Sequence, residues 1–185
     1  QKNVVSLRVA SIELPITYYA ISKCNENNTC LVVETNDTSN GWLLTLPDGN
    51  YEQSWANNSQ ASFIENAMND TISHAQPVSI DADGTVAPNP SLPHLTSLDL
   101  TFSLDRISGK SFFTAVLGGV FNPMPQVPGD LIGFDLIFNV DTNGRLTKDA
   151  NLQLRLGWQL GFRAPRYVSN IRCVSEGICL VCGPR

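Results

Sequence analysis

Alternation of apolar and polar side chains predicts β-strands along most of this sequence. The clearest run covers residues 132–140, where one face carries Ile132, Phe134, Leu136, Phe138 and Val140. The run ends in Asp141-Thr142-Asn143-Gly144, and Asn-Gly is a strong hairpin signal. A second apolar series follows at Leu152, Leu154, Leu156 and Trp158. We therefore expect two long strands paired across this turn.

Shorter segments repeat the strand pattern. Residues 31–33 and 42–44 flank a polar loop and suit a hairpin, and residues 98–104 alternate cleanly. Residues 77–81 lead into an Ala82-Asp83-Gly84 turn. The opening segment, 4–22, is apolar but contains Pro15, which favours an edge position or a bend.

One helix is predicted near residues 62–74. Its apolar residues recur with helical spacing at Phe63, Ile64, Ala67, Met68 and Ile72. Ser62 and Glu65 form a capping-box pattern at the start, and Pro77 lies just beyond the end. The predicted fold class is mainly β: an antiparallel sandwich, or a jelly-roll-like arrangement, with one packed α-helix.

Residues 112–128 depart from the strand pattern, because Gly118-Gly119 and several prolines interrupt them. We expect a loop or insertion there, with Phe121 and Met124 either plugging the core or serving binding. The whole chain, 1–185, is interpreted as a single β-rich domain. Since it starts at Gln1 and stops at Arg185 without a finishing element, it is expected to be an excerpt of a longer polypeptide.

Composition narrows the class of protein. An apolar fraction of 42% with 16% charged residues is typical of an ordered globular chain. A net charge of -5 with scattered basic residues argues against a nucleic-acid surface. Because no apolar run approaches the length of a membrane span, membrane contact is not indicated.

Five cysteines form two clusters, and their odd number prevents complete pairing within the chain. The candidate disulfide residues are Cys24, Cys30, Cys173 and Cys179; Cys182 completes the second cluster. Zinc would need a fourth ligand, and no histidine lies near, so we expect no metal. Glycosylation sequons occur at Asn27, Asn36, Asn57 and Asn69.

The sequence contains no G-x-S-x-G, phosphate-loop or H-E-x-x-H motif. His74, at the predicted helix end, is expected to interact with helix carbonyls. Asp81-Ala82-Asp83-Gly84 and the segment 141–144 begin like calcium loops but lack further ligands, so turn chemistry is preferred. A carboxylate pair could come from Asp99, Asp105, Asp130 and Asp135, although Asp135 is expected on a solvated strand face. We expect no enzyme activity and no cofactor.

Two motifs have compositions that are typical of structural segments and not of catalytic sites. The first is a turn motif, Pro47, Asp48, Gly49, Asn50 and Tyr51. The second, a glycine-spaced motif, comprises Leu156, Gly157, Trp158, Leu160, Gly161, Phe162 and Arg163. Its glycines would let backbone pass close to a neighbour while Trp158 fills the space between sheets. Arg163 and Arg166 would bond carbonyls or stack; with Trp158 they could instead form an anion or sugar site.

Together with the opening strand 7–22, these motifs resemble a family of minor capsid and virion structural proteins of large nucleocytoplasmic double-stranded DNA viruses. The resemblance implies a virion location, assembly through protein–protein interfaces, other capsid or virion proteins as partners, and homo-oligomers as a further option. A different class fits the sequons and the β pattern: a secreted or surface glycan-binding module using Trp42 and Trp55. Those two tryptophans would then have to be exposed.

Overall fold

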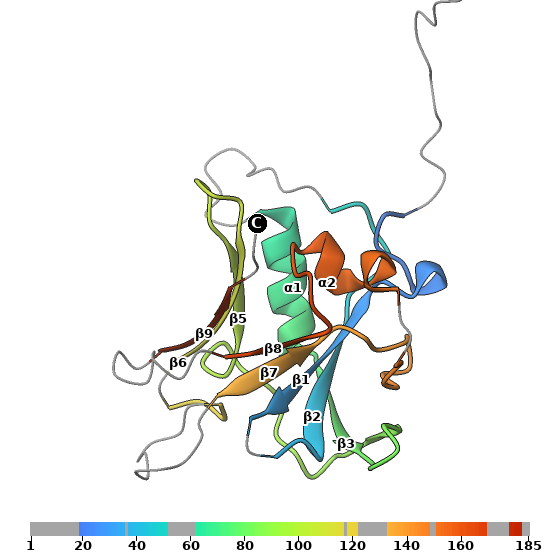
Figure 1. Ribbon diagram of the computed structural model, residues 1–185. Helices are drawn as coiled ribbons and strands as arrows, with labels where there is room; N and C mark the ends of the chain where they lie inside the picture. The colour runs from blue at the N-terminus through green and yellow to red at the C-terminus, as the bar shows by residue number, and fades with distance from the viewer. Residues whose placement is uncertain are drawn as a thin grey trace, which may run out of the picture.

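Two antiparallel β-sheets enclose the core of this protein (Figure 1). The computed structural model describes residues 19–35, 37–51, 62–116, 118–121, 133–148, 151–169 and 178–182. The larger sheet has the strand order β4-β3-β2-β1-β7-β8 and the smaller one β5-β6-β9. This arrangement confirms the predicted antiparallel, sandwich-like class.

The larger sheet begins as a meander in which successive strands pair with one another. Its strands are β1 (Thr29–Glu34), β2 (Asn40–Thr45), β3 (Gln76–Ile80), β4 (Val86–Pro88), β7 (Phe134–Ile137) and β8 (Arg166–Val168). The predicted hairpin of β1 and β2 is confirmed, with Val32 opposite Trp42. Apolar residues run almost continuously along β1 because both of its faces are buried.

The smaller sheet consists of β5 (Thr101–Leu104), β6 (Ser111–Val116) and β9 (Ile178–Cys182). The presence of β6 corrects the prediction for 112–128, whose first five residues belong to a strand and not to a loop. Alternate β6 residues, Phe113 and Ala115, are buried, a pattern that the glycines and prolines downstream obscured. Residues 122–128 lie outside the described part of the chain.

Helix α1 (Phe63–Ser73) confirms the helix prediction, including its capping box. The Ser62 hydroxyl accepts from the Glu65 amide at 3.4 Å, and the Glu65 carboxylate accepts from the Ser62 amide. Ile64, Met68 and Ile72 are buried, whereas Phe63, expected on the apolar face, is about half exposed. The helix packs against β5 and β2.

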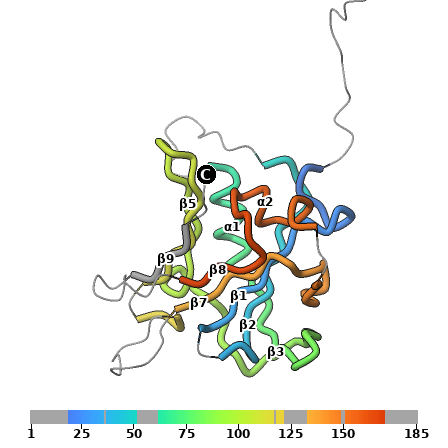
Figure 2. Tube along the Cα trace, in the orientation of Figure 1, coloured from blue at the N-terminus to red at the C-terminus, as the bar shows by residue number. Residues whose placement is uncertain are grey.

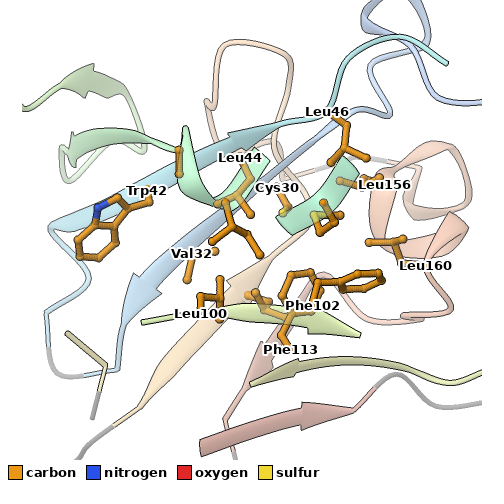
Figure 3. Close-up of a cluster of buried hydrophobic side chains, with 14 of the residues drawn as sticks. Cys30, Val32, Trp42, Leu44, Leu46, Leu100, Phe102, Phe113, Leu156 and Leu160 are labelled. Atoms are coloured by element: carbon orange, nitrogen blue, oxygen red, sulfur yellow. The ribbon is translucent and has the colours of Figure 1, made fainter. Parts of the chain in front are cut away.

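The main core joins all of these layers (Figure 3). Val32, Trp42 and Leu44 of the larger sheet belong to the same buried cluster as Phe102 and Phe113 of the smaller one. A second apolar cluster lies on the opposite face of the larger sheet, around Leu31, Val33 and Val78.

The long hairpin expected from residues 132–158 is only partly present. Its first strand is β7, and the turn is confirmed by the Gly144 amide donating to the Asp141 carbonyl at 3.0 Å. Beyond the turn, Leu146 makes an isolated bridge to Val140. The returning strand is instead the 3-10 turn η2 (Leu152–Leu154) followed by the one-turn helix α2 (Leu156–Gln159). Another 3-10 turn, η1 (Lys23–Asn25), precedes β1.

Candidate functional site

The two motifs, far apart in sequence, meet at one end of the fold. Tyr51 of the turn motif and Leu160 of the glycine-spaced motif line the same small cavity, together with Ile64 of α1. Its volume of about 110 Å³ is well below the roughly 300–1,000 Å³ of typical ligand pockets. The motifs therefore meet in packing and not around a ligand-sized cleft.

The turn motif holds the incoming chain segment by its backbone. The Gly49 amide donates to the Ile21 carbonyl at 2.9 Å, and the Ile21 amide donates to the Gly49 carbonyl at 3.1 Å. Side chains extend the pairing: Asn50 Oδ1 accepts from the Ala20 amide at 2.6 Å, and Asp48 Oδ1 accepts from the Lys23 amide at 2.7 Å. Asp48 and Asn50 thus bind the backbone of a neighbouring segment.

Gly49 lies under the side chain of Tyr51. Its φ is not positive. The Tyr51 ring folds back over it, 3.1 Å from the position a Cβ would take. The Tyr51 hydroxyl donates to the Pro47 carbonyl at 2.7 Å. Burial and the nearby Asp48 carboxylate raise the pKa of Tyr51, which favours this donor form.

The glycine-spaced motif is helical and not a strand, which corrects the sequence prediction. The Phe162 amide donates to the Gly157 carbonyl at 2.7 Å, and the Gly161 amide donates to the Trp158 carbonyl at 3.1 Å. This pair of bonds is a Schellman motif, which places Gly161 in the left-handed region with φ 93°. Gly161 and the following Pro165 were the helix-end signals in the sequence.

Gly157 confirms the expected close approach. A Cβ on this residue would lie 2.5 Å from Cγ of Phe138. Real Cβ atoms do not approach other atoms so closely, so α2 can pack on the Phe138 ring only with glycine here.

Phe162, and not Trp158, occupies the space between the sheets. Its ring centroid lies 5.9 Å from Phe113 in β6 and 4.9 Å from Phe138, which follows β7. Tyr167 of β8 packs edge-on against it at 5.0 Å. Each such aromatic contact stabilises the core by roughly 0.5–1.5 kcal/mol beyond its buried area. This cluster links both sheets to α2.

Trp158 is only partly buried, and Arg163 covers it. The guanidinium carbon lies 3.9 Å from the ring centroid, and Nη1 donates to the Trp158 carbonyl at 2.8 Å. Arg166 is engaged elsewhere, since its Nε donates to Asp135 at 2.8 Å. The anion or sugar site considered from the sequence is therefore not assembled by these residues.

Asp135 is fully buried, which overturns its expected solvated position. Besides the Arg166 guanidinium, its carboxylate accepts from the Thr35 hydroxyl at 3.1 Å. The strand order explains the difference, because β7 lies between β1 and β8: Arg166 belongs to β8, and Thr35 directly follows β1. A buried charge needs such partners to avoid a large desolvation penalty.

The other candidate carboxylates cap turns. Asp99 accepts from the Thr96 amide at 2.6 Å and from the Val120 amide at 2.5 Å. Asp105 accepts from the Ile107 and Ser108 amides. Asp130 lies outside the described residues.

The predicted roles of the remaining polar motifs are confirmed. His74 caps α1, with Nδ1 2.9 Å from the Asp70 carbonyl oxygen. At the Ala82-Asp83-Gly84 turn, the Gly84 amide donates to the Asp81 carbonyl at 2.8 Å. Hydrogen bonds from Thr85 lower the pKa of Asp83. Within the described ranges, no cluster of histidine, cysteine and carboxylate side chains could hold a metal ion.

The structure does not pair Cys24 with Cys30, one of the disulfides considered from the sequence, and it leaves the second cysteine cluster untested. Cys24 and Cys30 are both free thiols, the first exposed and the second buried. Burial raises the pKa of Cys30 to about 12, so it stays protonated. Cys173 lies outside the described residues. Cys179 is placed in β9 through its backbone alone.

Two of the four sequons are built into the fold. The Asn27 amide donates to the Ala20 carbonyl at 2.7 Å, and its oxygen accepts from the Ser22 amide. The Asn69 side chain bonds both backbone groups of Phe102, at 2.9 and 2.7 Å. Their amide groups are thus occupied in the folded chain. Asn36 and Asn57 lie outside the described residues.

Asn69 and Glu65 have a role that sequence reasoning missed. With the Leu104 amide donating to Glu65 Oε1 at 2.8 Å, α1 satisfies three backbone groups on the outer edge of β5. Exposed sheet edges invite pairing with other chains, so α1 blocks this edge. The sequence signal for this role was a polar Asn on the inward side of an amphipathic helix.

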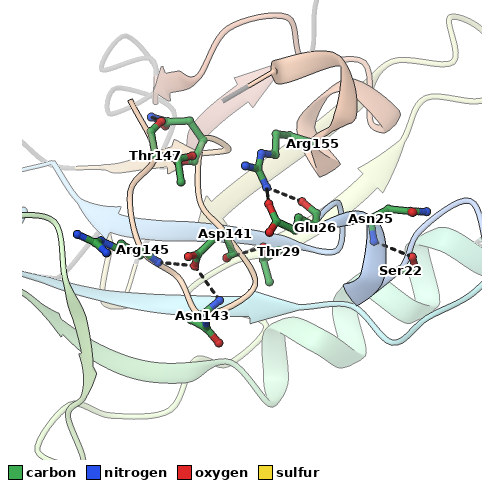
Figure 4. Close-up of polar contacts among 10 residues, drawn as sticks. Ser22, Asn25, Glu26, Thr29, Asp141, Asn143, Arg145, Thr147 and Arg155 are labelled. Atoms are coloured by element: carbon green, nitrogen blue, oxygen red, sulfur yellow. Dashed lines mark hydrogen bonds and ion pairs between the residues drawn. The ribbon is translucent and has the colours of Figure 1, made fainter. Parts of the chain in front are cut away.

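An ion pair between the largely buried Arg155 and the exposed Glu26 ties the end of η2 to the end of η1, just before β1 (Figure 4). Arg155, with 10% of its side chain exposed, donates through Nη1 to the Glu26 carboxylate at 3.0 Å and to the Glu26 carbonyl at 2.9 Å. Nearby, the Thr29 hydroxyl donates to the Asp141 carbonyl at 3.0 Å. These contacts fix the turn after β7 against β1.

Trp42 is completely buried, which contradicts the exposed position required by the glycan-binding alternative. Its indole N–H donates to the Pro93 carbonyl at 2.9 Å, and its ring packs edge-on against Phe121. Trp55 lies outside the described residues.

In the part of the chain that the structure covers, no helix combines the length and hydropathy of a membrane span. No family model, no curated protein sequence and no solved structure matches this chain.

Proposed function

We propose that this chain is a structural component of the particle of a large DNA virus, a minor or accessory capsid protein acting through protein–protein interfaces. The observation that supports the proposal is the structural role of the two motifs, which resemble motifs of such proteins. Tyr51 and Leu160 meet in one small cavity, and Phe162 joins the aromatic cluster between the sheets.

Residues that define a family of enzymes or receptors would be expected to converge on a cleft. Here the motif glycines meet steric demands at Phe138 and Tyr51, and the motif polar groups bond backbone. A family held together by such residues shares a scaffold, and its function would then lie in the surfaces that the scaffold presents.

Quantitative mass spectrometry of particles purified from the source virus tests the proposal. We expect the protein in a fixed ratio to the major shell protein, retained after salt washing and protease treatment of intact particles. Cross-linking of intact particles should join its lysines to other shell proteins. Absence from purified particles, or removal by the washes, would refute the assignment.

A further inference from the structure

The sequence contains two Asn-Gly pairs, Asn40-Gly41 and Asn143-Gly144. Asparagine deamidates most readily before glycine, because a residue without Cβ leaves its backbone nitrogen open to attack the preceding side-chain carbonyl carbon. The reaction has two requirements. The asparagine side chain must rotate toward that nitrogen, and the nitrogen must be released from its own hydrogen bond. The fold restrains the two pairs very differently.

The Asn40-Gly41 pair is restrained in both respects. Asn40 Nδ2 donates to the Asp37 carboxylate at 2.8 Å, and Asn40 Oδ1 accepts from Asn89 Nδ2 at 3.2 Å. Gly41 lies in β2 between β1 and β3, and a Cβ there would be 2.7 Å from the Val32 carbonyl oxygen. Attack on Asn40 therefore requires both a released side chain and an opened sheet, which is a rare event in a core strand.

The Asn143-Gly144 pair lacks the first restraint. Asn143 is exposed, and its side chain has no hydrogen-bond partner among the described residues. Its backbone amide donates to Asp141 Oδ1 at 2.8 Å (Figure 4). The Gly144 amide is held by a turn bond to the Asp141 carbonyl at 3.0 Å. A turn outside the strands opens locally at a low cost in free energy, so the nitrogen is released far more often than in β2.

The loop that carries Asn143 covers the second apolar cluster. Figure 2 shows this loop, in orange, next to the green loop after β3, and the Leu146 amide donates to the Gly84 carbonyl at 3.3 Å. Gly144 is itself buried, and a Cβ on it would lie 3.0 Å from the Leu43 side chain. A longer main chain between Asn143 and Gly144 would displace this cover.

We propose that Asn143 is a site of spontaneous deamidation in the folded protein. The Gly144 nitrogen loses its proton to solvent hydroxide and bonds to Asn143 Cγ. The side-chain nitrogen takes up a proton from water and leaves as ammonia, and a cyclic imide remains. Water then opens the imide at either carbonyl carbon, which yields aspartate or isoaspartate with a new carboxylate.

The isoaspartate product alters the loop. Its main chain runs through the former side chain and is longer, so the Gly144 amide moves away from the Asp141 carbonyl. Leu146 is displaced from Gly84 in the same way, and the second apolar cluster loses part of its cover. The isoaspartate form is therefore less stable than the unmodified protein.

Incubation of the full chain at mildly alkaline pH, followed by peptide mass spectrometry and labelling with an isoaspartyl methyltransferase, tests the site. We expect conversion at Asn143 at least about tenfold faster than at Asn40, because a turn opens more often than a paired strand. In denaturant the two pairs should react at similar rates, since only the fold distinguishes them. Asn143→Gln, at an exposed position, should fold normally and lose most of the isoaspartate.

The isoaspartate form, separated by ion exchange, should unfold at a lower temperature than the unmodified chain. An unchanged unfolding temperature would overturn the proposed effect on the loop. Faster conversion at Asn40, a rate ratio in the folded protein equal to that in denaturant, or wild-type isoaspartate levels in Asn143→Gln would overturn the site itself. Particle composition decides the virion assignment separately from all of these outcomes.

Discussion

Gly157 lies so close to the ring of Phe138 that a Cβ at this position would come within 2.5 Å of Cγ. This contact seats α2 against β7 and brings Phe162 between the sheets. The glycine-spaced motif is thus a packing device, in which one glycine removes a steric clash and the other ends a helix.

Gly157→Ala should destabilise the protein by about 1–3 kcal/mol, because the added methyl forces the Phe138 ring or α2 to shift. Urea unfolding followed by tryptophan fluorescence measures the change. Gly109→Ala is the control for a glycine with nothing within 4 Å of its Cβ position, although its positive φ adds modest strain. If Gly157→Ala unfolds at the wild-type midpoint, the proposed clash is absent in solution.

Asn69→Ala should destabilise the protein by about 1–3 kcal/mol and promote aggregation. The substitution removes both hydrogen bonds to Phe102 and opens the edge of β5. Thermal unfolding with light scattering reports both effects. Asn66→Ala, at an exposed position of the same helix, should change neither. Equal behaviour of the two variants would argue against edge blocking by α1.

Stability should fall on acidification partly through Glu65. Burial acts to raise the pKa of Glu65, but hydrogen bonds from Ser62 and Leu104 and the charge of Arg106 outweigh it, so the pKa is lowered. Because the folded-state pKa lies below the unfolded value near 4.5, the stabilisation is complete above that pH. It is lost as the pH falls through the lowered pKa.

Denaturant titrations of wild type and Glu65→Gln between pH 7 and pH 3 check this linkage. The variant should be less stable at pH 7, and the difference should shrink on acidification because protonated Glu65 loses its advantage over Gln. Parallel curves over the whole range would mean that the Glu65 carboxylate does not contribute as described.

Alkylation should distinguish the two cysteines before β2. Cys24 is exposed and should react in the folded protein, whereas burial and a pKa of about 12 should protect Cys30 until unfolding. Peptide mass spectrometry after labelling in the presence and absence of denaturant resolves the sites. Detection of a Cys24–Cys30 disulfide, or rapid labelling of native Cys30, would contradict the structure.

Where hydrogen bonds join residues that are close in the chain, the sequence alone was sufficient to predict the local structure. The capping box of Ser62 and Glu65, the turns at Gly84 and Gly144, and the β1–β2 hairpin all follow from residues adjacent in the chain. Such elements depend on local backbone geometry, which specific residue types favour wherever they occur. The fold class followed from the same patterns.

Only the tertiary structure decided the positions of Leu156, Trp158 and Asp135. The spacing of Leu152, Leu154, Leu156 and Trp158 is compatible with a strand. The chain forms a helix instead, because Gly157 fits against the Phe138 ring and Gly161 closes a Schellman motif. Asp135 occupies a polar position in its strand, yet it is buried and bonded by Thr35, which follows β1, and by Arg166 of β8. The physical reason is common to both: periodicity states which residues share a face, whereas burial depends on which distant segments cover that face.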